Sequence, residues 1–124
     1  MVRLHMVVEG QTEEAFINTM LVEHLAQYNV FADVRCVQAS RRRGKIFRGG
    51  LLDYACAKKD LELWMKEDRN PDAYFTTIFD LYALPADFPI YDEAKTWADA
   101  YQRVALLEQA FSRDIGSCRF VPYI

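Results

Sequence analysis

Two acidic side chains follow two apolar runs of the sequence, and together they could bind a metal ion. Glu9 comes directly after the run 4–8, and Asp80 comes directly after the run 74–79. In open α/β sheets, ligands and catalytic groups gather at the carboxyl ends of parallel strands. Carboxylate oxygens are preferred ligands of Mg²⁺ and Mn²⁺. If the two runs form neighbouring strands, we expect Glu9 and Asp80 to face one crevice and to share one divalent cation.

Three further residues could contribute to such a site. Gly10 permits backbone geometry and close ligand approach that other residues do not. Glu13 could reach the same cation from the first turn of the following helix, although an acid there also stabilises the helix dipole. Tyr82 could donate a hydrogen bond near the site, or it could pack its loop onto the sheet. For the two acids themselves, the alternatives are a solvated acid at a helix start and an aspartate that caps a turn.

A basic segment lies at residues 40–50, which include three glycines and no acidic residue. Arginine forks suit phosphate oxygens, so we expect this segment to bind the backbone of a nucleic acid. The alternative is a solvated loop whose cations pair with acids of the same chain. The five basic residues are Arg41, Arg42, Arg43, Lys45 and Arg48.

Apolar periodicity and turn residues predict the elements that would position these side chains. Strands are predicted at 4–8, 30–37, 73–79 and 118–124, and helices at 12–28, 51–68 and 93–113. The order βαβαβαβ is typical of a mostly parallel sheet with helices on both faces. The sequence thus predicts an α/β fold with a four-stranded, mostly parallel sheet in three layers, as in Rossmann-like domains.

Length and composition limit the class of protein. The chain has 124 residues, 52% of them hydrophobic, and a formal net charge of −3. These values predict a single folded domain over residues 1–124 and argue against a uniformly basic coat protein for nucleic acid. Three widely spaced cysteines favour reduced thiols and a cytoplasmic location. The sequence has neither a signal-peptide pattern nor an apolar run long enough for a membrane span, so we expect no membrane partner.

The sequence around the two acids resembles a bacterial family known as domain of unknown function 4276. The resemblance lies in three blocks, which are Val8-Glu9-Gly10-Gln11-Thr12-Glu13-Glu14, the segment 76–89 that contains Phe79-Asp80-Leu81-Tyr82, and Arg119-Phe120-Val121-Pro122-Tyr123-Ile124. The family is similar to Toprim domains, the α/β modules of topoisomerases, primases and several nucleases, so the resemblance implies that the predicted four-stranded fold is Toprim-like. The family pattern usually continues further, so we expect residues 1–124 to be its N-terminal part.

The resemblance implies roles for particular residues. It implies that Glu9 is the general acid/base and that Asp80 is the first aspartate of a metal-binding Asp-x-Asp motif. Tyr82 stands where the second aspartate would be, which removes a ligand and argues against chemistry that needs two metal ions.

Two classes of function follow from these observations, and whether the chain is an enzyme stays open at this point. The first is a magnesium-dependent phosphodiester hydrolase, a nuclease of bacterial (phage) defence or DNA repair that binds nucleic acid. The second is a degenerate, non-catalytic Toprim-like module that binds nucleic acid or a protein partner such as an ATPase. Assembly of several copies is compatible with both, and a nucleotide-handling enzyme that uses the same acids is a third, weaker hypothesis.

Overall fold

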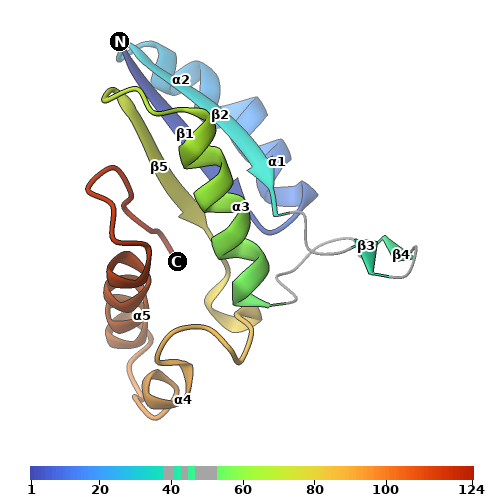
Figure 1. The fold of residues 1–124 in the computed structure, drawn as a ribbon, viewed down its shortest axis with the longest axis vertical. Helices are drawn as coiled ribbons and strands as arrows, with labels where there is room; N and C mark the ends of the chain where they lie inside the picture. Colours follow the sequence, from blue (N-terminus) through green and yellow to red (C-terminus); the bar gives the residue numbers. More distant parts are fainter. Residues whose placement is uncertain (38–40, 43–44, 47–52) are drawn as a thin grey trace.

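The computed structural model describes residues 1–37, 41–42, 45–46 and 53–124, with 41–42 and 45–46 described as backbone only. Its centre is a three-stranded parallel sheet in the order β2-β1-β5 (Figure 1). Val8 at the end of β1 pairs with Cys36 on one side and with Ile78 on the other. The carboxyl ends of the three strands therefore meet at one edge of the sheet. The strands are β1 (Val2–Val8), β2 (Val30–Cys36) and β5 (Ala73–Ile78).

Helices cover both faces of this sheet, so the prediction of an α/β fold with a parallel sheet is confirmed. One face carries a continuous helical run that consists of α1 (Gln11–Phe16), the π-helix η1 (Ile17–Leu21) and α2 (Val22–Ala26). The other face carries α3 (Tyr54–Glu67) and α5 (Ala100–Ile115). The shorter elements are β3 (Arg41–Arg42), β4 (Lys45–Ile46), the 3₁₀ helix η2 (Leu81–Ala83) and α4 (Tyr91–Ala94).

The alternation of side chains along β1 divides the core into two parts. Met6 and Val8 pack against Ile17 of η1, whereas Val7 belongs to the larger cluster between the sheet and helices α3 and α5. Phe111 of α5 is fully buried in this larger cluster, and its ring lies 4.8 Å from the ring of Phe120. Successive residues of a strand point to opposite faces, so an apolar run such as 4–8 is what a strand covered on both faces requires.

The predicted fourth strand at 118–124 is not formed as a regular strand. A single parallel bridge joins Phe120 to Phe75 of β5, and the Phe75 N–H donates a hydrogen bond to the carbonyl of Arg119 at 2.8 Å. Further along, Pro122 has no N–H to donate, and the Tyr123 N–H donates to the hydroxyl of Thr77 at 3.1 Å instead of to the backbone. The Val121 N–H donates to the carbonyl of Phe75 at 3.0 Å, and the Phe79 N–H donates to the carbonyl of Tyr123 at 3.4 Å. Residues 119, 121 and 123 make the bonds to β5, so the N–H that Pro122 lacks is not one that faces β5, as expected for proline at a sheet edge. The segment therefore follows β5 irregularly, because the Thr77 hydroxyl takes the place of a backbone acceptor.

The predicted helix at 93–113 is divided into two helices. Helix α4 ends at Ala94, and α5 begins after Asp99, whose Oδ1 accepts a hydrogen bond from the Tyr101 N–H at 3.0 Å. An aspartate in this position satisfies one of the unpaired N–H groups of a new helix start, so the chain can change direction here. The helix ends at Gly116 with φ of 70°, a left-handed conformation that favours glycine.

We expect replacement of Phe111 by alanine to lower the free energy of unfolding by roughly 3–5 kcal/mol, because it leaves a cavity between α5 and the sheet. The matched control is Tyr101→Ala on the same helix, where the side chain is 87% exposed. The control should change stability by about 0.5 kcal/mol or less. Urea denaturation followed by circular dichroism measures both variants, and equal losses would contradict this description of the core.

Candidate functional site

Glu9 occupies the first position after β1, at the edge where the three strands end. Its side chain is buried, with 7% exposure, and its Oε1 accepts a hydrogen bond from the backbone N–H of Asp80. Asp80 lies two residues beyond Ile78, the partner of Val8 in the ladder. Parallel pairing of β1 with β5 therefore brings together two acids that are far apart in the sequence.

Burial dominates the electrostatics of Glu9. Loss of water raises the pKa of its carboxyl to about 7, and the nearby charges of Asp80 and Glu13 raise it further. The hydrogen bond from the Asp80 amide acts in the opposite direction, because it stabilises the charged form. Glu9 therefore exchanges a proton near neutral pH, a property that ordinary surface glutamates lack.

Asp80 itself is exposed, and its side chain has a local structural role. Its Oδ1 accepts a hydrogen bond from the Tyr82 N–H at 3.0 Å, so Asp80 caps the 3₁₀ helix η2. This is the turn-capping alternative considered for Asp80, and it engages one of the two carboxylate oxygens. A capping aspartate can still offer its second oxygen to a cation, so the capping role and a ligand role are compatible.

The carboxylates of Glu9 and Asp80 form at most a partial metal site. Within the described part of the chain, no hydrogen bond engages Oε2 of Glu9 or Oδ2 of Asp80. These hard oxygens suit Mg²⁺ or Mn²⁺, which complete their coordination with water and substrate oxygens. In the same described ranges, no group of three or more His, Cys, Asp or Glu side chains is positioned to hold a metal ion. The predicted metal role of Glu9, Asp80 and Glu13 thus remains a prediction.

The three accessory residues differ from one another in their surroundings. Gly10 has φ of −159° and ψ of −174°, an extended conformation that any residue adopts, so its backbone freedom is not required for this fold. Glu13 lies half-buried in the first turn of α1 and contributes negative charge beside Glu9. Tyr82 is 79% exposed, so it does not pack its loop onto the sheet. Its ring lies 5.9 Å from the guanidinium carbon of Arg103.

Of the five predicted nucleic-acid-binding residues, two lie outside the described residues, and the structure describes only the backbone of the other three. Arg43 and Arg48 lie outside the described residues. The backbones of Arg41 and Arg42 form β3, which pairs antiparallel with β4, where Lys45 is located. The sequence-based prediction that these five residues bind phosphates therefore stays a prediction.

Sequence reasoning did not pair Cys36 with Glu14, although both lie near the same sheet edge. Cys36 ends β2, and its thiol donates a hydrogen bond to Oε2 of Glu14 at 2.8 Å. Burial and the neighbouring Glu14 carboxylate raise the pKa of the Cys36 thiol to about 12. The thiol therefore stays protonated at neutral pH and is no nucleophile. The signal that could have found this pair is the position of Cys36 one residue before the predicted strand end at 37, and of Glu14 in the first turn of the helix that follows the strand 4–8.

A second charged cluster was also missed, near the opposite end of the sheet. Arg3 of β1 donates two hydrogen bonds to Asp68, and His5 Nε2 lies 2.7 Å from Asp68 Oδ2. The hydrogen bonds from Arg3 and His5 lower the pKa of Asp68 well below its usual range. Asp68 is the C-terminal cap residue of α3, so this cluster fixes the end of α3 to β1. The negative charge of Asp68 is balanced by the guanidinium of Arg3, whereas the charges near Glu9 are those of other acids.

Comparison with known proteins identifies a family but no characterised relative. A model of the family described as "Domain of unknown function (DUF4276)" matches residues 8–124. No curated protein and no solved structure was found to match the chain. None of the helices in the described part of the chain has the length and apolar character needed to cross a membrane.

The raised pKa of Glu9 predicts a pH dependence of stability. The folded state holds the proton up to about pH 7, whereas the unfolded state releases it near 4.5. Glu9 therefore favours the folded state most at low pH, and this contribution falls as pH rises from about 4.5 to about 7. Over that interval we expect the free energy of unfolding of the wild type to fall by roughly 2–3 kcal/mol relative to that of Glu9→Gln. Glutamine keeps the acceptor for the Asp80 amide but does not titrate.

Chemical denaturation at several pH values, in the presence of EDTA, measures this difference directly. Use of the difference between wild type and Glu9→Gln cancels the contributions of the other acids, including Asp68. Parallel stability curves for the two proteins would show that Glu9 titrates as an ordinary surface glutamate.

Proposed function

This chain belongs to the family described as Domain of unknown function (DUF4276), and we propose that it is a divalent-metal-dependent phosphodiester hydrolase of Toprim-like type. The observation that carries this proposal is the buried carboxyl of Glu9, held at the carboxyl end of the central strand against the Asp80 backbone. A perturbed acid at the carboxyl edge of a parallel sheet is a typical feature of an active site.

Glu9 is the general acid/base in this proposal. With a pKa of about 7, both its protonated and ionised forms are present at neutral pH. General acid-base catalysis is most effective when the pKa of the group lies near the working pH. The Asp80 amide holds Oε1 in place, which leaves Oε2 to give a proton to a leaving oxygen or to take one from attacking water.

Asp80 and Glu9 are the residues that would hold Mg²⁺ or Mn²⁺, with Glu13 as the predicted third acid. When bound, such an ion supplies positive charge that polarises a phosphoryl oxygen and stabilises the transition state. The predicted phosphate-binding residues Arg41, Arg42, Arg43, Lys45 and Arg48 would hold the nucleic-acid backbone in a salt-sensitive manner. A nuclease of this kind in the bacterial cytoplasm fits a role in phage defence or DNA repair, acting alone or with an ATPase partner.

The second candidate function is a non-catalytic binding module, and two observations favour it. By the resemblance to Toprim domains, Tyr82 stands where the second metal-binding aspartate would be, and Asp80 uses one oxygen as a cap. In this alternative, Glu9 would be a structural acid whose proton is kept by burial. Nucleic acid or a protein partner would then bind without being cleaved.

The decisive variant for the hydrolase is Glu9→Gln, because glutamine accepts the same hydrogen bond but cannot transfer a proton. We expect it to lower the cleavage rate of single- or double-stranded nucleic acid in Mg²⁺ by roughly a hundredfold or more. Glu23→Gln, at an exposed position of α2, is the matched control and should leave the rate unchanged. Cleavage by Glu9→Gln at the wild-type rate would remove Glu9 from the mechanism.

Metal binding gives a second test that does not depend on knowing the substrate. Above pH 7, Mg²⁺ at about ten times its dissociation constant should raise the free energy of unfolding by about 1.4 kcal/mol relative to EDTA. Asp80→Asn should abolish this stabilisation. Asp33→Asn should not, although Asp33 also accepts a backbone hydrogen bond, from the Val34 N–H at 2.9 Å. Absence of any Mg²⁺ effect on wild type would favour the non-catalytic module.

A further inference from the structure

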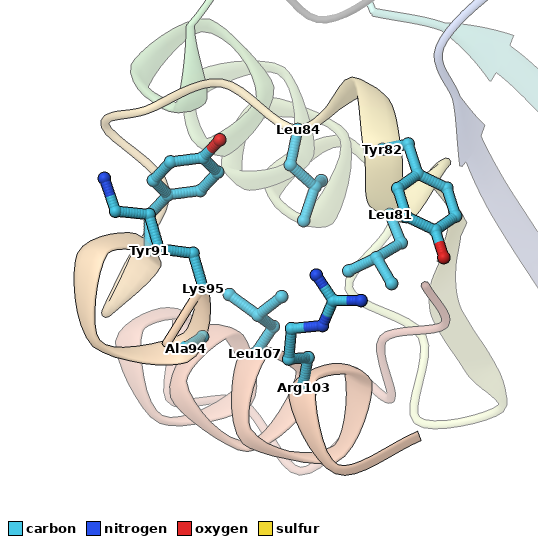
Figure 2. A pocket seen from close by; sticks show the side chains of 8 residues that line it. All are labelled: Leu81, Tyr82, Leu84, Tyr91, Ala94, Lys95, Arg103 and Leu107. Atoms are coloured by element: carbon cyan, nitrogen blue, oxygen red, sulfur yellow. The ribbon is translucent and has the colours of Figure 1, made fainter. Parts of the chain in front are cut away.

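We propose that a pocket beside η2 binds the phosphate of a nucleotide through Arg103, with the exposed ring of Tyr82 as a stacking surface for the base. The inference rests on the proposed function, because it assigns this pocket to the substrate of the same site. The pocket lies between η2, α4 and the first turns of α5, and it has a volume of about 130 Å³ (Figure 2).

Arg103 is the charged group that points into the pocket. Figure 2 shows its guanidinium directed toward the centre of the ring of lining side chains, whereas the ammonium of Lys95 lies on the far side of Tyr91. Lys95 is also paired with Asp92, at 3.2 Å. The cation that a ligand would meet in this pocket is therefore the guanidinium of Arg103.

The surroundings of Arg103 leave its charge without a counter-ion. Its Nε is buried and has no hydrogen-bond partner, and within the described ranges no carboxylate pairs with its guanidinium. Arg103 also lies in the first turn of α5, where the helix dipole disfavours a positive charge. A partly buried cation in such a position is costly unless an anion binds to it. An arginine fork matches phosphate oxygens in geometry and charge.

The size of the pocket decides how much of a ligand it can hold. A volume of about 130 Å³ has room for a phosphate group beside Arg103. In the proposed arrangement the base of the nucleotide lies over the rim. Tyr82 stands at that rim, 79% exposed and 5.9 Å from the guanidinium carbon of Arg103. Aromatic rings in this setting stack on bases of any sequence.

The floor of the pocket is apolar and belongs to the packed core, which favours a defined position for the bound group. Leu84 and Leu107 are 7% and 3% exposed, and both belong to the large core cluster. Low-polarity walls strengthen the attraction between a guanidinium and a phosphate. The pocket is also connected to the acidic pair, because η2, which carries Tyr82, begins at Asp80. One short turn thus joins the proposed catalytic acids to the proposed phosphate pocket.

Nuclear magnetic resonance titration of the ¹⁵N-labelled full chain with dAMP, in EDTA, tests this pocket without catalysis. Deoxyadenosine, which lacks the phosphate, is the comparison ligand and should bind at least about tenfold more weakly than dAMP. The largest shifts should lie in η2 and in the first turns of α5. Equal affinity for the two ligands, or shifts confined to other elements, would overturn the proposal.

Variants test phosphate binding by Arg103 and base stacking on Tyr82 independently. Arg103→Gln should remove the preference for dAMP over deoxyadenosine, and Arg103→Lys should reduce it, because lysine keeps the charge but not the fork. Tyr82→Leu should weaken both ligands to the same degree. Lys95→Gln removes an equal charge from the pocket wall and should leave the affinities for both ligands unchanged. If Arg103→Gln keeps the wild-type preference for dAMP over deoxyadenosine, the assignment of phosphate binding to Arg103 is overturned. If Arg103→Gln does not fold, an unchanged preference in Arg103→Lys overturns it instead.

The same titration distinguishes failure of the pocket from failure of the proposed hydrolase. Glu9→Gln should bind dAMP with wild-type affinity. Phosphate-dependent binding in a protein that cleaves nothing would support the pocket while removing the hydrolase. Cleavage by a protein that shows no preference for dAMP would support the hydrolase and overturn the pocket.

Discussion

The hydrogen bond between the Asp80 amide and the buried Glu9 carboxyl is the interaction on which the candidate site depends. It joins the ends of two neighbouring parallel strands, since Glu9 follows β1 and Asp80 follows β5. A carboxyl removed from water needs either a partner or a proton. One amide is a partial partner, so the group compensates by holding its proton to about pH 7. The burial of Glu9 thus accounts both for its hydrogen bond to the Asp80 amide and for its raised pKa.

Comparison of the buried Glu9 with the half-buried Asp68 shows why the carboxyl edge is the better candidate for function. Near the amino end of the sheet, Asp68 is matched by Arg3 and His5, and its pKa is lowered. At the carboxyl edge, Glu9 faces other acids and no cation in the described structure, and its pKa is raised. A matched acid stabilises a fold, whereas an unmatched acid costs stability and is retained where its chemistry is used.

Much of the fold could be predicted from the sequence, because the strand run 4–8 is largely apolar on both faces and the run 74–79 is rich in aromatic and β-branched residues. The strand order could not, since no local pattern states that β1 and β5 are neighbours; only the paired acids hinted at it. The division of the predicted helix at 93–113 was missed because Asp99, a helix-capping residue, lies within a continuous apolar periodicity. The fourth strand was predicted from its apolar residues, and the segment does bond to β5, but the Thr77 hydroxyl replaces a backbone acceptor, so a regular ladder does not form.

Within the candidate site, the sequence predicted that Glu9 and Asp80 would follow neighbouring strand ends, but not the surroundings that give them their properties. The exposure of a side chain and the identity of its counter-charges depend on contacts between distant segments. Arg103 illustrates this, because on the sequence it is one of several basic residues on a predicted helix. Only packing of α5 against η2 and α4 turns it toward a pocket and leaves its Nε without a partner.

Tyr82 connects the proposed hydrolase site with the proposed phosphate pocket, and the structure gives it a second interpretation besides that of a missing metal ligand. Considered as a missing metal ligand, it argues against chemistry that needs two ions. Its ring, however, is exposed and faces Arg103, while its backbone N–H holds the Asp80 side chain in place. The same turn can therefore position one carboxylate and present one stacking surface. If the site holds one metal ion beside Glu9, the guanidinium of Arg103 would supply the positive charge that a second metal ion supplies in two-metal enzymes. Both a guanidinium and a metal ion neutralise the charge of phosphate oxygens.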